Sequence, residues 1–144
     1  MTINILDKHL INKIAAGEVI ERPANVIKEL LENSLDANAT EIKIEIENSG
    51  LKKIKISDNG IGMTREDLQL CCKRHATSKI TTEDDLNKVN SLGFRGEALA
   101  SIAEVSNLKI KTKTQEDEVG NMIEIEGGIP LSDTKIGCSN GTII

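Results

Sequence analysis

Apolar residues recur with helical spacing between Asn25 and Ala37. At about 3.6 residues per turn, one broad face gathers five apolar side chains, namely Val26, Ile27, Leu30, Leu31 and Leu35. The opposite side carries Glu29, Asn33 and Asp36. Pro23, just upstream, is suited to the first turn of a helix. We therefore predict an amphipathic helix whose apolar face covers a sheet.

Two alternating stretches follow at residues 41–47 and 51–57, with Asn48-Ser-Gly50 between them. Alternation with a period of two is typical of a half-buried strand, and the polar triplet is typical of a turn. These stretches predict an antiparallel hairpin with one apolar and one charged face. The long helix is expected to cover the apolar face.

The rest of the pattern predicts shorter elements: helices over 6–16 and 64–73, strands over 107–114 and 119–126, a loop over 127–140, and a strand that begins at 141–144. A helix is also expected to start at Gly96 or Glu97. Because an apolar strand without a closing turn is an unusual terminus, we expect the chain to be the first part of a longer protein.

Composition bounds the class of protein. A chain of 144 residues with 38% hydrophobic and 28% charged residues is ordinary for one globular domain. One Phe, no Trp and no Tyr require an aliphatic core and argue against a base-stacking surface for single-stranded nucleic acid. The net charge of −5 does not indicate a surface that binds the phosphate backbone of a nucleic acid.

Cysteine usage and hydropathy indicate the compartment. Cys71, Cys72 and Cys138 are odd in number and lack a C-x-x-C spacing, which favours free thiols over a disulfide framework or a zinc site. No apolar run is long enough for a membrane span, and the first residues lack the regions of a signal peptide. We expect a soluble, cytoplasmic protein.

Candidate chemistry begins on the polar side of the long helix. Glu29 is a carboxylate that can take a proton from water, and the Asn33 carboxamide oxygen can bind a hard cation. Asp36 lies beside them, about one turn further on. From the helix alone, a merely solvated polar face explains the same residues.

A second candidate is the turn from Asp58 to Met63, Asp-Asn-Gly-Ile-Gly-Met, which follows the second strand. Two glycines around one apolar residue permit close approach of the backbone to a ligand. Asp58 is placed to accept a hydrogen bond from the exocyclic amine of a base. An aspartate that only caps a turn is an equally good local explanation.

A third candidate is the glycine-flanked loop before the helix at Gly96 or Glu97. Gly93 and Gly96 bracket Phe94 and Arg95, and a loop of this kind that opens a helix is suited to anion binding. A plain loop with solvated cations is the alternative.

These stretches together resemble one family. Five segments are similar to the N-terminal ATPase domain of the MutL mismatch-repair proteins, namely Lys28-Glu-Leu-Leu-Glu-Asn-Ser-Leu-Asp-Ala37, Asp58-Asn-Gly-Ile-Gly62, Gly93-Phe-Arg-Gly-Glu-Ala-Leu-Ala-Ser-Ile102, 14–23 and 74–80. The first two are shared with the wider GHKL superfamily. The resemblance implies the Bergerat fold, a two-layer α/β (α+β) sandwich with a mixed, mostly antiparallel sheet covered by helices.

The resemblance also implies a role for each site residue. Glu29 would be the general base that activates water, and Asn33 the protein ligand to Mg²⁺. Asp58 would accept from the adenine amine, with Thr142 nearby. The remaining nucleotide contacts would come from Asp36, Ala37, Gly62 and Met63, and from a lid and phosphate loop made of Thr77, Ser78, Lys79, Gly93, Phe94, Arg95, Gly96, Glu97, Ala98 and Leu99.

For the whole protein, the resemblance implies an ATP-driven switch. ATP would close the lid and dimerise the N-terminal domains, which links a MutS-type mismatch-recognition protein to strand incision. Residues 1–144 would be the ATP-binding domain, without the second (transducer) and C-terminal dimerisation domains. DNA would be bound largely by those other parts, with no membrane partner. Since a phosphate-contacting lysine lies in the second domain, we expect this chain alone to be a slow or inactive ATPase.

Two alternatives remain at this point. One is the ATP module of a histidine kinase or topoisomerase. This module would need a phospho-acceptor helix or a different lid sequence, and residues 74–80 and 91–102 argue against both. The other is a scaffold that keeps the fold and has lost nucleotide binding. The presence of Glu29, Asn33 and Asp58 argues against the scaffold.

Overall fold

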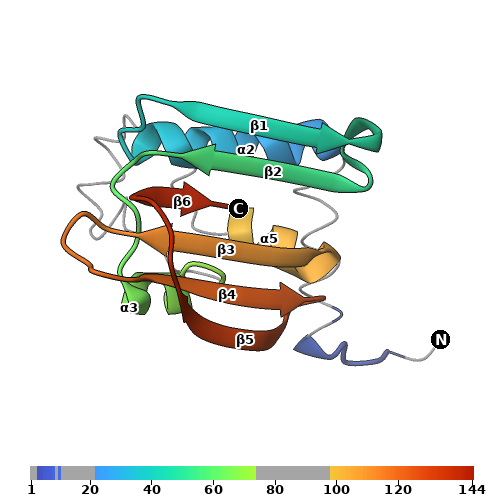
Figure 1. Ribbon diagram of the computed structural model, residues 1–144. Coiled ribbons are helices and arrows are strands. Elements are labelled where there is room, and N and C mark those ends of the chain that lie inside the picture. The colour runs from blue at the N-terminus through green and yellow to red at the C-terminus, as the bar shows by residue number, and fades with distance from the viewer. Residues whose placement is uncertain (1–2, 9, 11–21, 74–97) are drawn as a thin grey trace, which may run out of the picture.

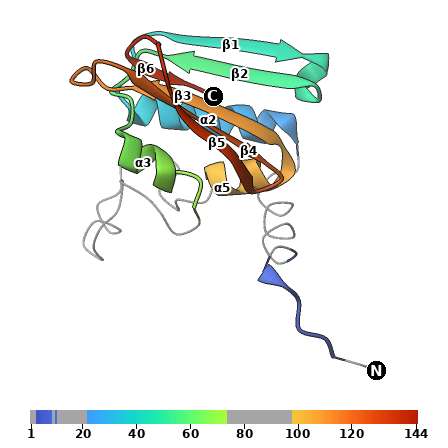
Figure 2. The same ribbon diagram turned by 60° about the horizontal axis from the view of Figure 1, so that its bottom comes forward.

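The computed structural model describes residues 3–8, 10, 22–73 and 98–144. In this part of the chain, a sheet and a set of helices form two layers (Figure 1). The sheet has six strands in the order β1-β2-β6-β3-β4-β5, and its neighbouring strands are antiparallel. Helices α2, α3 and α5 lie on one face of the sheet, as Figure 2 shows.

The bounds of the elements agree with much of the predicted pattern. The long helix is α2, Pro23–Asp36, with the proline in its first turn. The first hairpin is β1, Ile42–Glu47, and β2, Lys53–Asp58, joined through a short 3-10 turn at Asn48–Gly50. The other elements are α3 Arg65–Leu70, α5 Ala98–Val105, β3 Asn107–Lys113, β4 Gly120–Glu126, β5 Ile129–Ile136 and β6 Gly141–Ile143. The helix expected over 6–16 falls largely outside the described residues.

Strand β5 corrects the prediction of a loop over 127–140. It pairs with β4 from Gly120–Ile136 to Glu126–Ile129, with one register shift between Glu124 and Ile125. Gly127 and Gly128 both have positive φ, 55° and 82°, as a tight hairpin turn with the twist of the strands requires. Strand β5 contains Pro130, and it is an edge strand, where a residue without an N–H is tolerated.

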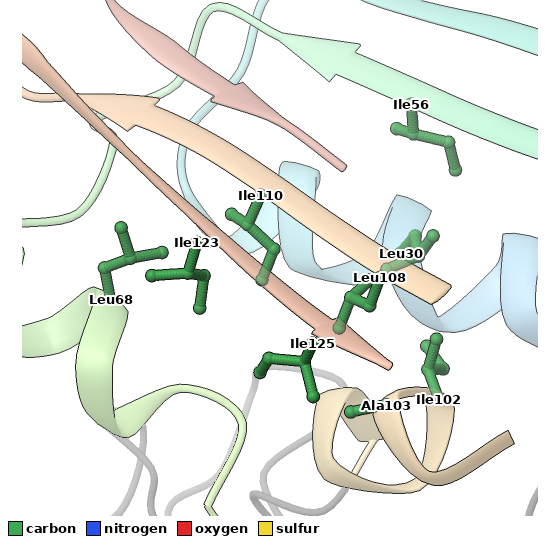
Figure 3. Packing of buried hydrophobic residues seen from close by; sticks show 9 residues of the cluster. All are labelled: Leu30, Ile56, Leu68, Ile102, Ala103, Leu108, Ile110, Ile123 and Ile125. Atoms are coloured by element: carbon green, nitrogen blue, oxygen red, sulfur yellow. The ribbon is translucent and has the colours of Figure 1, made fainter. Parts of the chain in front are cut away.

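An aliphatic core lies between the sheet and the helices. Figure 3 shows how the side chains of α2, α3 and α5 meet those of β2, β3 and β4. The buried cluster consists of Leu30, Ile56, Leu68, Ile102, Ala103, Leu108, Ile110, Ile123 and Ile125. The prediction of a core without aromatic residues is confirmed for the described part of the chain.

Two details of the predicted core are wrong. Leu35 is 58% exposed, because α2 turns its neighbour Ser34 toward the sheet, where the Ser34 hydroxyl has a partner. The apolar face of the first hairpin is covered only in part, since Ile44 and Ile46 on the edge strand β1 are 43% and 48% exposed. The sheet is therefore wider than the part of it that α2 covers.

Candidate functional site

A row of polar side chains crosses the helix-covered face of the sheet. Asp58 of β2 stands opposite Thr142 of β6, and Thr142 stands opposite Thr112 of β3. Directly paired residues place their side chains on the same face. The neighbouring row is apolar and contains Ile56 and Ile110, which are 2% and 0% exposed. The sheet thus presents a polar strip at the border of its core.

Asp58 is held by three hydrogen bonds. The Ser34 hydroxyl of α2 donates to Oδ2 at 2.8 Å. The backbone N–H groups of Gly60 and Thr142 donate to Oδ1 at 2.9 and 3.3 Å. These bonds fix the carboxylate between helix and sheet, and Oδ2 keeps capacity for one more donor. The simple turn-capping explanation accounts for the Gly60 bond and leaves the other two unexplained.

The turn after β2 is fastened to the end of α2. Ile61 donates its N–H to the carbonyl of Ala37 at 2.9 Å. The Asn59 carboxamide oxygen accepts from the N–H groups of Thr40 and Glu41 at 2.8 and 3.0 Å. Residues that follow Asp58 are therefore placed by the helix as well as by the strand.

Gly62 is required by the packing of this turn. Its φ is 71°, and a Cβ there would lie 2.2 Å from the carbonyl oxygen of Lys113. In the structure, the backbone that approaches Gly62 closely is that of β3, whereas the sequence pattern predicts such an approach to a ligand. Met63 follows, and its N–H donates to the Thr112 hydroxyl at 2.9 Å.

The polar residues of α2 are half-buried. Glu29, Asn33 and Asp36 all have intermediate exposure, as does Ala37 at the helix end. The Ser34–Asp58 bond places this helix against the end of β2. The structure therefore places the last turn of α2, with Asn33, Asp36 and Ala37, beside the end of β2 that carries Asp58.

The lid and phosphate-loop candidates divide at residue 98. Ala98 and Leu99 begin α5 and are half-buried, and Leu99 packs against the core. The remaining candidates lie outside the described residues, namely Thr77, Ser78, Lys79, Gly93, Phe94, Arg95, Gly96 and Glu97.

Two buried polar residues of the site were not singled out in the sequence analysis. Ser34 is 3% exposed and Thr112 is 0% exposed, and both join Asp58 or Thr142 to the rest of the fold. Thr112 carries a detectable signal, because it continues the inward register of Leu108 and Ile110 with a polar side chain. A hydroxyl in the apolar register of a strand requires buried partners.

The described residues contain no group of three or more His, Cys, Asp or Glu side chains that could hold a metal ion. The half-buried Asn33 offers one hard oxygen ligand on α2, which fits an ion shared with phosphate and water.

The cysteines are free thiols, as predicted. The Sγ atoms of Cys71 and Cys72 are 3.7 Å apart. The hydrogen bond with Cys72 and burial raise the pKa of Cys71, whereas the same hydrogen bond lowers the pKa of Cys72.

Comparison with known proteins settles the family. Residues 20–128 match the family described as "Histidine kinase-, DNA gyrase B-, and HSP90-like ATPase". The chain belongs to this ATPase family. The matched segment contains α2, the Asp58 turn and the start of α5, so the resemblance found in the sequence is confirmed.

Within the family, the chain is similar to MutL. It is 54% identical over 142 residues to the DNA mismatch repair protein MutL of Desulforamulus reducens, covering 99% of this chain and 22% of that protein. It is 52% identical over 143 residues to MutL of Methanothrix thermoacetophila, covering 99% of this chain and 26% of that protein. The chain therefore spans about a fifth to a quarter of the length of these curated relatives.

Solved structures show the same fold. The Aquifex aeolicus MutL ATPase domain complexed with ADP matches with a TM-score of 0.65 and 36% identity, covering 87% of this chain and 41% of that one. The N-terminal domain of a DNA repair protein matches with a TM-score of 0.74 and 34% identity, covering 92% of this chain and 37% of that one.

In the described part of the chain, no helix is long and apolar enough to cross a membrane.

Proposed function

We propose that this chain binds ATP with Mg²⁺ at the end of the sheet where Asp58 meets α2. The observation that carries the proposal is the anchoring of Asp58 by Ser34, Gly60 and Thr142. Three donors fix the carboxylate, which remains an acceptor for the amino group of a base. The relative solved with ADP supports a nucleotide as the ligand.

The helix α2 supplies the groups for the phosphate end. Asn33 would hold Mg²⁺ together with phosphate oxygens and water, and the ion would neutralise charge on the transferred phosphoryl group. Glu29, one turn earlier on the helix, would orient the attacking water and accept its proton. A general base of this kind contributes about 10²–10⁴-fold to a rate.

The MutL relatives support a proposal for the role of the chain in a larger protein. We propose that the chain is the ATP-binding domain of a MutL-type mismatch-repair protein. In that role, nucleotide binding would drive dimerisation with a second copy and communication with a MutS-type partner and with incision. Turnover by residues 1–144 alone is expected to be slow, because the resemblance places a phosphate-contacting lysine in a second domain.

The Mg²⁺ dependence of binding tests the site on α2. Isothermal titration calorimetry of a non-hydrolysable ATP analogue should give tighter binding with Mg²⁺ than with EDTA. Asn33→Ala should weaken Mg²⁺-dependent binding by at least about tenfold and leave metal-free binding nearly unchanged, because it removes a cation ligand.

Asn25→Ala is the control on the same helix, since Asn25 lies two turns away at the first turn of α2. It should leave both affinities unchanged. No binding by a folded wild-type chain, with or without Mg²⁺, would favour the scaffold explanation and contradict the proposal.

A further inference from the structure

Thr112 is part of the polar strip, and its hydroxyl takes part in three hydrogen bonds. Its Oγ1 accepts from the N–H of Met63 at 2.9 Å. The same atom lies 3.1 Å from the carbonyl oxygen of Gly141 and 2.9 Å from the hydroxyl of Thr142. Thr112 is fully buried, so water does not replace any of these partners.

The number of protons decides the direction of each bond. A hydroxyl has one proton to donate and two lone pairs to accept with. The Gly141 carbonyl carries no proton, so in this contact Thr112 is the donor. All three bonds form together only when the Thr142 hydroxyl donates to Thr112. Since unmade hydrogen bonds are costly in a buried site, this arrangement is the favoured one.

The direction of that bond determines what Thr142 offers to a ligand. Its single proton points to Thr112, so its oxygen can only accept. Asp58, which stands opposite Thr142, is a carboxylate and also only accepts. Two adjacent acceptors match a ligand group with hydrogens to donate, such as an amino group, and repel an oxo group.

We propose that Thr112 is a positioning residue that makes the proposed nucleotide site selective for 6-aminopurine over 6-oxopurine nucleotides, by directing the Thr142 proton away from the ligand. The inference rests on the proposed nucleotide site and adds a residue that does not itself contact the base. Replacing the Thr112 hydroxyl by a methyl group would free the Thr142 proton to turn and donate to an oxo group.

The test compares one pair of nucleotides on three proteins. Non-hydrolysable ATP and ITP analogues differ in the 6-position of the base, and calorimetry gives both affinities for wild type, Thr112→Val and Thr112→Ser. Wild type should prefer the ATP analogue strongly. Thr112→Val should reduce the ATP-to-ITP ratio by about tenfold or more, with tighter ITP binding contributing, and Thr112→Ser should keep the wild-type ratio.

A purely structural role of Thr112 gives another result, because it weakens both nucleotides by the same factor. An unchanged ratio in a folded Thr112→Val protein therefore overturns the inference while the nucleotide site stands. Failure of wild type to bind either nucleotide would overturn the proposed function itself.

If Thr112→Val does not fold, Thr142→Val examines the same acceptor directly. It should weaken the ATP analogue more than the ITP analogue, which lowers the ratio. Equal weakening of both analogues would contradict the inference.

Discussion

Asp58→Asn is expected to abolish useful nucleotide binding. The substitution replaces an acceptor oxygen by an NH₂ group. Two hydrogen-bond donors, this NH₂ group and the amino group of the base, would then oppose each other. A charge-assisted hydrogen bond of about 3 kcal/mol would be lost, which corresponds to a factor of about 100 in affinity. Calorimetry with a non-hydrolysable ATP analogue measures the change.

The fold should survive this substitution. The amide oxygen can still accept from Gly60 and Thr142, and the NH₂ group can donate to the Ser34 hydroxyl, which also accepts. Asp133→Asn is the matched control, since Asp133 contacts Arg65 and Gln69 at the surface of β5. Asp58→Asn with wild-type affinity would mean that Asp58 does not bind the base.

Gly141→Ala is expected to cause the largest loss of stability. Gly141 has a φ of 114°, and a Cβ there would lie 2.0 Å from the carbonyl oxygen of Asp58. Backbone atoms of β2 cannot move away without breaking the pairing with β6, so the strain adds to the cost of positive φ. We expect the free energy of unfolding to fall by at least about 3 kcal/mol, measured by urea denaturation.

Gly137→Ala, in the segment between β5 and β6, provides the comparison. A Cβ at Gly137 would meet no atom within 4 Å, so this substitution should change stability by less than about 0.5 kcal/mol. If the two variants unfold at the same urea concentration, β6 does not pack against Asp58 as described.

The sequence predicted the elements whose pattern is local. The apolar spacing of α2 and the alternation of β1, β2, β3 and β4 are visible without tertiary information. The local pattern also singled out Glu29, Asn33 and Asp58 as candidates, and the resemblance supplied their roles. Strand β5 was predicted as loop, although its turn carries two adjacent glycines. Only its place at the sheet edge explains why Pro130 is tolerated.

The site could be predicted only in part, because its supports come from distant segments. Ser34 reaches Asp58 across 24 positions of the chain and Thr112 reaches Thr142 across 30. The spacing of apolar and polar residues along the chain does not indicate contacts between such distant segments. Leu35 was wrongly assigned to the core for the same reason, since the partner of Ser34 decides how α2 is rotated.

The most direct test of the central claim is a map of the ligand on the chain. Amide ¹H–¹⁵N spectra of residues 1–144 should be recorded while a Mg²⁺ complex of a non-hydrolysable ATP analogue is added. We expect the largest shifts at Gly60, Gly62, Met63 and Thr142 and on the polar side of α2, with little change in β5. Shifts that are absent, or centred away from Asp58, would contradict a nucleotide site at this end of the sheet.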